Sequence, residues 1–130
     1  MSQQLELTFI LFCIYQWKHY IADFPLQREY MLRKTLPHWN FLLPLVLHCA
    51  VHAFLTLLIV LWYAPSLWWL AIFDFVVHFI MDRIKSGPRY LGRYNDLRKA
   101  GFWNVLGFDQ MIHHYTHIYI IYVIVVHLYP

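Results

Sequence analysis

Four stretches of apolar residues, separated by polar segments, dominate the pattern along this chain of 130 residues. Each stretch approaches or exceeds the length of about 18–20 residues that an α-helix needs to cross the hydrocarbon core of a bilayer. Pro65 and Ser66 make a tight break between the second stretch and the third. The pattern predicts four helices, over residues 5–23, 40–63, 66–83 and 102–129.

The two longer polar segments, residues 24–39 and 84–101, connect the first helix to the second and the third to the fourth. In the first connector, apolar side chains such as Phe24 and Leu32 are mixed with charged ones such as Arg28. This mixture is typical of a short amphipathic helix that lies in the membrane interface. Glycine and proline interrupt the second connector, which favours turns there.

The composition indicates a membrane protein rather than a soluble one. Hydrophobic residues make up 61% of the chain and charged residues 13%, and the mean hydropathy is +0.47. An average soluble domain is about 45–50% apolar and about 25% charged, and a short soluble chain has too little interior for so many apolar side chains. We therefore expect an all-α integral membrane protein. It forms one domain over residues 1–130, a bundle of four transmembrane helices with an interfacial helix between the first two.

Neither the cysteines nor the first apolar stretch indicates covalent processing of the chain. Cys13 and Cys49 lie in apolar stretches without a partner motif, so we predict two buried free thiols rather than a disulfide. The first stretch lacks the basic start and the small-residue cleavage site of a signal peptide, so we expect it to remain as a helix.

Basic residues lie at one end of the predicted helices. All ten Lys and Arg residues fall in or beside the two connectors, with Lys18 near the end of the first helix. Because cytoplasmic loops are enriched in these residues, both connectors are predicted to be cytoplasmic and both termini to lie outside a bacterial inner membrane. The formal net charge of +3 is too small to indicate nucleic-acid binding, so we expect membrane lipid as the partner.

Histidine and aspartate recur at a spacing of four residues, in a chain with nine histidines. On an α-helix two residues four apart share one face, so such a pair can hold a single metal ion, as the two histidines of HExxH do. Each predicted helix carries one pair: His19 and Asp23, His48 and His52, His78 and Asp82, and Asp109 and His113.

The predicted topology places all four pairs in the cytoplasmic half of the bilayer, since a helix rises about 1.5 Å per residue. A single pair of this kind also serves as a hydrogen bond or ion pair between helices, but four pairs at one depth favour a metal site. Imidazoles and carboxylates together suit Zn²⁺, Mn²⁺ or Fe²⁺. We therefore predict one or two divalent transition metal ions, with zinc foremost.

Further polar residues near these pairs are candidates for supporting roles. Asp74, His114 and His117 are candidates for orienting the ligands or carrying protons. The second connector is rich in basic residues, which topology alone explains but which also suit the phosphate of a lipid substrate. The candidates for that contact are Arg83, Lys85, Arg89 and Arg93.

The string from His19 to Gln27, HYIADFPLQ, resembles the opening of a bacterial and phage family, domain of unknown function 3307. The likeness covers nearly the whole chain and implies a small multi-helix inner-membrane protein without an assigned activity. A weaker likeness to membrane-bound metal-dependent hydrolases is an analogy. Other matching positions are Met31 and Lys34, the His48 and His52 pair, the stretch 78–85, and Asp109, Gln110 and His113.

The sequence leaves several functions open. The leading hypothesis is a metal-dependent hydrolase that acts on a lipid or lipid-linked phosphate or ester at the cytoplasmic leaflet. A second is a diiron lipid oxidase, because His48 with His52, and His113 with His114 and His117, faintly resemble the histidine boxes of membrane desaturases. A third is a non-enzymatic protein whose polar layer binds or passes a cation or locks the bundle. A haem site is less favoured because it leaves the Asp partners unexplained. A second copy of the chain is a further possible partner.

Overall fold

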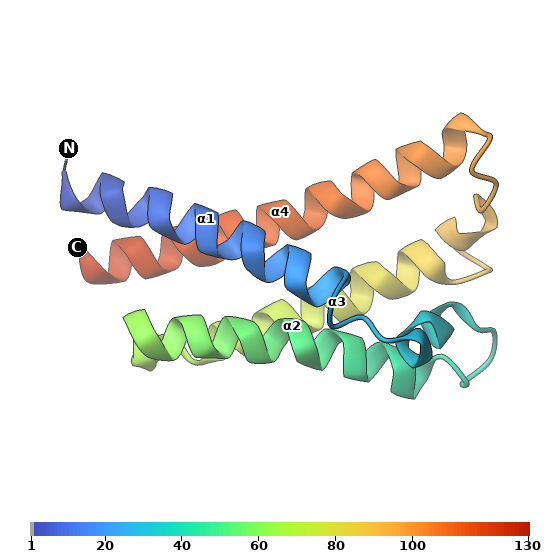
Figure 1. Cartoon of the computed structure of the whole chain (residues 1–130), viewed down its shortest axis with the longest axis horizontal. Helices are drawn as coiled ribbons and strands as arrows, with labels where there is room; N and C mark the ends of the chain where they lie inside the picture. The colour runs from blue at the N-terminus through green and yellow to red at the C-terminus, as the bar shows by residue number, and fades with distance from the viewer. Residues whose placement is uncertain (1) are drawn as a thin grey trace.

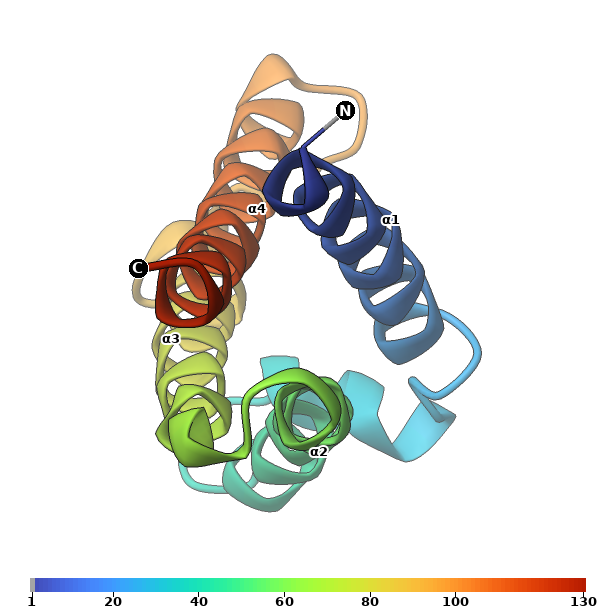
Figure 2. The ribbon, with the colours of Figure 1, turned by 90° about the vertical axis from the view of Figure 1, so that its left-hand side faces the viewer.

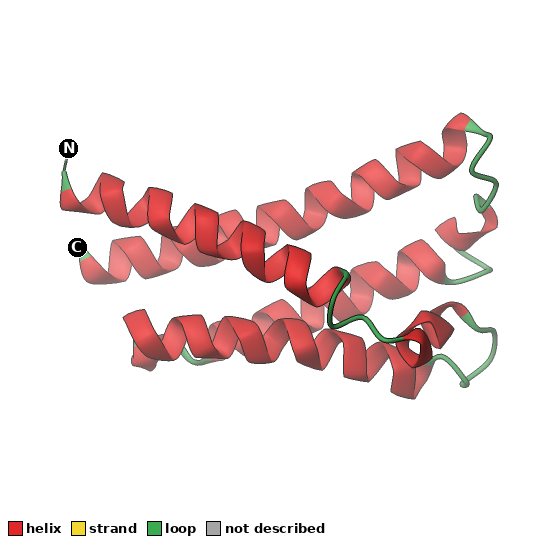
Figure 3. Cartoon of the chain, in the orientation of Figure 1, coloured by secondary structure: helices red, strands yellow, loops and turns green. Residues whose placement is uncertain are grey.

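The computed structural model describes residues 2–130, and the part that it describes is helical without strands (Figure 3). Four α-helices form the body of the protein, close to the four that the hydrophobic pattern predicts. Ser2 caps the first, with its hydroxyl accepting a hydrogen bond from the Leu5 amide at 3.3 Å. The elements are α1 (Gln3–Asp23), η1 (Glu29–Thr35), α2 (Leu42–Tyr63), η2 (Pro65–Leu67), α3 (Trp69–Ser86), η3 (Leu91–Arg93) and α4 (Ala100–Leu128).

The helices run roughly alongside one another as a bundle (Figure 1). Both termini and the short η2 turn lie at one end, and the two connectors that contain η1 and η3 lie at the other. Viewed from the end with the termini, α4 stands between α1 and α3, and α2 lies beside α3 (Figure 2). The basic connectors are therefore neighbours in space, as the sequence predicts, although they are far apart in the chain.

Apolar side chains close the half of the bundle that holds the termini. Leu11, Val60, Leu70 and Ile124 are fully buried there, one from each helix. A smaller apolar cluster of Phe41, Leu45 and Cys49 lies nearer the connectors. Buried polar residues lie on the connector side of the first cluster, at the same level as the second one, because Cys49 is next to the buried His48 in α2.

Two of the four helices, α2 and α4, are long and apolar enough to cross a membrane. α1 and α3 are less apolar because both carry charged residues, among them Lys18 in α1 and Asp74 and Arg83 in α3. By length and composition, therefore, the described residues contain two candidate membrane spans.

The structure bears on two local expectations. The first connector contains a short helix, as the sequence predicts, and it is a 3₁₀ helix over Glu29–Thr35. Of the two cysteines, Cys49 is buried as predicted, whereas Cys13 is exposed. Cys13 lies on the outer face of α1.

The turn between α3 and η3 depends on the small size of Gly92. Its amide donates a hydrogen bond to the Gly87 carbonyl at 3.1 Å. A Cβ atom at Gly92 would lie 2.5 Å from the Ser86 carbonyl oxygen and 2.7 Å from that of Gly87, and neither backbone atom can move away cheaply. The connector therefore folds back on the end of α3 only with glycine at this position.

We expect Gly92→Ala to lower the unfolding free energy by about 1–3 kcal/mol, because the turn must open. The loss should be seen as a lower thermal unfolding temperature of the purified protein in detergent. Gly107→Ala in α4 is the matched control, since a Cβ atom there meets nothing within 4 Å. Alanine favours a helix over glycine by about 1 kcal/mol, so the control should unfold at the same or a higher temperature. Equal unfolding temperatures for Gly92→Ala and the unmodified protein would refute this role of the turn.

Candidate metal centre

The four helices bring all eight predicted ligands into one polar layer inside the bundle. His48, His52, His78 and His113 are almost completely buried, and the pairs on each helix face the centre because their members lie one turn apart. Ligand atoms come within 4.8 Å of one another in four groups, which also include Asp74 and His117. These groups are His19, His52 and His78; Asp23, His48 and His52; Asp74, His78 and His117; and Asp82, Asp109 and His113.

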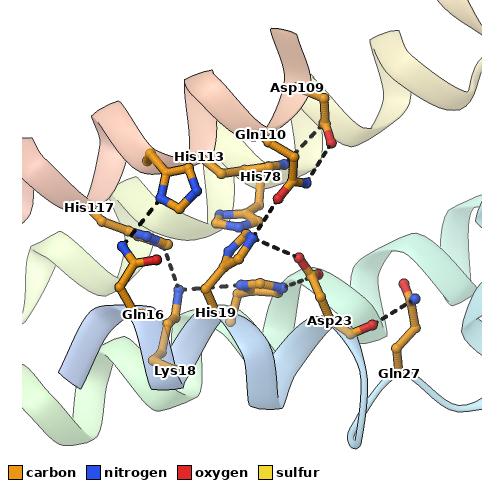
Figure 4. Close-up of polar contacts among 12 residues, drawn as sticks. Gln16, Lys18, His19, Asp23, Gln27, His78, Asp109, Gln110, His113 and His117 are labelled. Atoms are coloured by element: carbon orange, nitrogen blue, oxygen red, sulfur yellow. Dashed lines mark hydrogen bonds and ion pairs between the residues drawn. The ribbon is translucent and has the colours of Figure 1, made fainter. Parts of the chain in front are cut away.

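Asp23, at the end of α1, is surrounded by three imidazoles from two helices. Its Oδ2 lies 3.1 Å from His19 Nε2, and its Oδ1 lies 3.0 Å from His52 Nε2 and 3.4 Å from His48 Nε2. The Asp23 side chain is 20% exposed, more than those of the other aspartates in the layer. Figure 4 shows it facing the His19 ring at the edge of the polar layer.

A second acidic group lies on the other side of His48. Asp82 Oδ2 is 3.2 Å from His48 Nε2, and Asp82 Oδ1 is 3.3 Å from His113 Nε2. His113 Nε2 also lies 3.1 Å from Oδ1 of Asp109, four residues earlier on α4. Asp82 therefore connects the group around Asp23 to the group around His113 through its two oxygens.

These separations match those of a metal site. Zinc binds histidine nitrogen and carboxylate oxygen at about 2.0–2.2 Å, so two ligands of a tetrahedral ion lie about 3.3 Å apart. The nitrogen–oxygen distances around Asp23 span 3.0–3.4 Å. His19 and His48 place their Nε2 atoms against a carboxylate oxygen of Asp23, while their Nδ1 atoms are buried without a hydrogen bond in the described part of the chain. The buried His/Asp groups can hold a metal ion.

Three lysines neutralise three of the four buried aspartates. Lys18 reaches Asp74 Oδ2 from α1, Lys34 reaches Asp82 Oδ2 from η1, and Lys85 reaches Asp109 Oδ2 from its own position in α3, each at 2.7 Å. In the described part of the chain, Asp23 makes contacts with histidines but has no lysine or arginine within 4.0 Å. Asp23 is thus the one carboxylate of the layer that is free of a cationic partner.

The three predicted supporting residues lie beside the ligands. Asp74 is fully buried and accepts hydrogen bonds from Lys18 and, at 2.6 Å, from the Thr56 hydroxyl. Its Oδ1 lies 2.9 Å from His78 Nδ1, while His78 Nε2 is buried without a partner. An imidazole anchored through one nitrogen to a carboxylate presents the other nitrogen as a ligand. Asp74 therefore orients His78 toward the group that it forms with His19 and His52.

His117 and His114 contact the layer from α4. His117 Nε2 lies 3.4 Å from Lys18 Nζ, so Lys18 is surrounded by Asp74, His117 and, at 3.3 Å, the Nδ1 of His52. His114 is half-buried and lies 3.4 Å from the Gln16 amide, with its ring 5.3 Å from that of His19. Gln110 adds a 2.9 Å contact to His19 Nε2. His117 thus belongs to the layer, and His114 lies at its border.

The four basic residues predicted to bind a headgroup do not form one cluster. Lys85 points into the layer toward Asp109, whereas the Arg93 guanidinium packs 5.0 Å from the Tyr94 ring centroid. Arg83 and Arg89 line a separate cavity between the connectors. The structure therefore separates a lysine at the polar layer from two arginines at the surface.

The comparisons with known proteins give one match. A family model described as a protein of unknown function, DUF3307, matches residues 8–129. The chain belongs to this family. No curated protein and no solved structure matches the chain. The DUF3307 match covers most of α1, the other three α-helices and every group of the polar layer, but carries no activity.

Sequence reasoning missed the role of lysine in this DUF3307 chain. Lys18 was expected to mark the cytoplasmic end of the first helix, but it is 4% exposed and forms a buried ion pair with Asp74. The signal was available, because a lysine within an apolar stretch needs a partner inside the membrane. Lys34 and Thr56 were also missed as contacts of the layer, because nothing in their local sequence identifies their partners.

The buried Lys18–Asp74 pair predicts a non-additive mutational effect. Lys18→Met leaves Asp74 buried with an uncompensated charge, so the variant should lose about 3–5 kcal/mol of unfolding free energy, measured by thermal or denaturant unfolding in detergent. Lys18→Met combined with Asp74→Leu removes both charges and should recover most of that loss. Losses that simply add in the double variant would mean that the two groups do not depend on each other.

Proposed function

We propose that this chain is a multi-pass protein of the bacterial inner membrane that holds a divalent transition metal ion in its His/Asp layer. We further propose that it uses the ion to hydrolyse an ester or phosphoester bond of a membrane lipid at the cytoplasmic leaflet. The observation that carries the proposal is Asp23, a partly exposed carboxylate with three imidazole nitrogens at 3.0–3.4 Å and no ammonium partner in the described part of the chain.

The distribution of polarity supports four membrane crossings rather than two. Charged and polar side chains lie inside the bundle, while large apolar ones face outward, the reverse of a soluble protein. The two helices that are less apolar overall follow this rule as well: Phe9 and Trp17 of α1 and Ile72 and Ile80 of α3 are each more than half exposed. The charged side chains of Lys18 in α1 and of Asp74 and Asp82 in α3 are buried inside the bundle, so lipid can surround both helices.

The orientation follows from the basic connectors. Arg and Lys residues crowd the end of the bundle that contains η1 and η3, and the opposite end carries both termini (Figure 1). The positive-inside rule then places the connectors in the cytoplasm and the termini outside. The polar layer lies on the connector side of the apolar core, so its ion would be reached from the cytoplasmic leaflet.

Charge balance favours one metal ion over two. Four buried carboxylates face three ammonium groups, which leaves one negative charge in the layer when the histidines are neutral. One divalent ion at Asp23 offsets that charge, whereas a second would have to displace Lys34 or Lys85 from Asp82 or Asp109. Histidine nitrogen with carboxylate oxygen suits zinc first, and manganese or iron next. The diiron oxidase is disfavoured for the same reason.

The geometry also suits hydrolysis. Asp23, His48 and His52 form one three-ligand group, and a divalent ion with three protein ligands polarises an ester or phosphoryl oxygen and acidifies a water molecule. A cavity of about 410 Å³ reaches Lys85, whose ammonium lies beside Asp109 and is suited to a phosphate. The rest of this cavity includes Phe102, Val105 and Leu106, which suit a lipid tail. His114 and His117 would carry protons at the α4 side.

One alternative is supported by a specific observation. Three ammonium groups already pair with three carboxylates from other positions in the bundle. The layer, with a bound ion at Asp23, would then serve as a structural lock, meaning that it only stabilises the packing of the four helices. A cation pathway across the membrane is disfavoured. Leu11, Val60, Leu70 and Ile124 fill the outer half of the bundle without a polar route.

The metal proposal predicts one ion per chain in protein purified without chelators, measured by inductively coupled plasma mass spectrometry. Asp23→Asn should weaken metal binding by about 100-fold or more, because changes beyond the ligands alone cost about 10–100-fold. Asp96→Asn is the matched control. Asp96 lies in the second connector, where hydrogen bonds from Arg98 lower its pKa, so the control also removes a carboxylate charge. Unmodified protein without stoichiometric metal would refute the metal site.

The hydrolase proposal predicts release of a lipid fragment that carries oxygen from water. Protein reconstituted into vesicles of bacterial lipid extract in ¹⁸O-water should release labelled phosphate or fatty acid, detected by mass spectrometry. A chelator should abolish the release, added zinc should restore it, and Asp96→Asn should retain it. Asp23→Asn should be folded and inactive. Metal-loaded, folded protein without any labelled product would favour the structural lock instead.

A further inference from the structure

A second cavity lies at the connector end, apart from the polar layer. It has a volume of about 490 Å³ and forms where the segment before α2 faces the end of α3 and the turn that follows it. None of its residues belongs to the four groups of metal-ligating side chains. Its lining includes His38, Trp39, Phe41, Arg83, Arg89 and Tyr90.

The two arginines of this cavity have no acidic partner in the described part of the chain. Lys18, Lys34 and Lys85 each have an aspartate at 2.7 Å, but Arg83 and Arg89 have no carboxylate within 4.0 Å. Two guanidinium groups that line one cavity without a counter-charge attract an anion. The planar fork of arginine binds phosphate and carboxylate through paired hydrogen bonds, and phosphate is the anion that a lipid surface supplies.

Packing holds Arg83 in place before any ligand arrives. Its guanidinium carbon lies 3.4 Å from the centroid of the Phe41 ring, and its Nη1 donates a hydrogen bond to the Leu36 carbonyl at 3.4 Å. The stacked guanidinium still has free N–H groups, because arginine carries five and this contact uses one. Arg83 thus combines a fixed orientation with unused donors, which lowers the entropy lost on binding.

The backbone presents aromatic groups at the same cavity. His38 adopts a φ of 56°, in the left-handed region that histidine enters at a cost, and such residues cluster at binding sites. The next residue, Trp39, is 78% exposed, and Tyr90 across the cavity is 56% exposed. Exposed Trp and Tyr at the ends of membrane helices lie at the level of the lipid headgroups.

We infer that this cavity binds the phosphate headgroup of an anionic phospholipid of the cytoplasmic leaflet. Arg83 and Arg89 hold the phosphate, and Trp39 and Tyr90 border the headgroup. The two helices that border the cavity carry exposed apolar side chains that can contact the acyl chains: Leu43 at the start of α2 is 57% exposed and Ile80 in α3 is 53% exposed. That surface favours a lipid over free phosphate. The site needs the membrane location but not the metal ion, so either proposal can fail alone.

Native mass spectrometry of the detergent-solubilised full chain tests this site with phosphatidylglycerol as the anionic probe and phosphatidylcholine as the neutral one. We expect the unmodified protein to retain phosphatidylglycerol selectively, and Arg83→Gln with Arg89→Gln to weaken it about tenfold or more, since hydrogen bonds to charged groups are lost. Arg28→Gln with Arg33→Gln is the matched control. It removes the same charge from the first connector, outside the cavity, and should bind as before.

Each other outcome overturns the inference. Equal weakening by the control pair would mean diffuse attraction to a basic surface, and equal retention of phosphatidylcholine would mean that the arginines do not select the headgroup. Displacement of the lipid by millimolar inorganic phosphate would identify a free-phosphate site. If the double variant fails to fold because Arg83 packs on Phe41, Arg89→Gln alone decides, with an expected loss of severalfold. Metal content should be unchanged in all of these variants.

Discussion

The fold depends on neutralising four carboxylates that lie inside a bundle whose outer surface is apolar. An isolated charge in such a place costs several kcal/mol, so each aspartate needs a cation or a set of hydrogen-bond donors. Lys18, Lys34 and Lys85 provide three of those partners at 2.7 Å, and histidines surround the fourth. In the proposed membrane location, the polar layer therefore holds the helices together, since apolar side chains pack as well against lipid as against protein.

The same pairs determine how the connectors are placed. Lys34 belongs to η1, yet its partner Asp82 is near the end of α3, so the ion pair attaches the first connector across the bundle. Lys85 extends from the last turn of α3 to Asp109 in the first half of α4 and thereby links the two helices that the second connector joins. These contacts bring the basic residues of both connectors to one end, where Arg83 and Arg89 remain without acidic partners in the described chain. The same packing of helices and connectors therefore pairs the buried aspartates with lysines and leaves a basic surface at the connector end.

The sequence predicts the helices and the aspartate–histidine pairs because both depend on local spacing. Residues four apart on a helix share a face whatever the neighbouring helix does, so His19 with Asp23 and Asp109 with His113 follow from the pattern alone. The lysine partners do not follow, because they depend on how helices rotate and pack. Lys18 and His19 are adjacent in the chain but contact different aspartates, Asp74 and Asp23. The 3₁₀ form of η1 was missed for a similar reason: its composition predicts an amphipathic segment, but Lys34 must reach Asp82, a tertiary contact.

The position of Asp23 explains why one carboxylate is left without an ammonium partner. Asp74, Asp82 and Asp109 have side chains that are 0–4% exposed, so each would be a buried net charge without its lysine. Asp23 lies in the last turn of α1, and its side chain is 20% exposed. In the connector that follows, the Gln27 side chain donates a hydrogen bond to the Asp23 carbonyl. Imidazoles at 3.0–3.4 Å satisfy this carboxylate when no cation is bound, and it is the most exposed aspartate of the layer. An ion that binds there gains imidazoles from two helices, which the bundle has already placed at ligand distance. The layer is thus built to accept a cation at its edge while lysines keep its interior neutral.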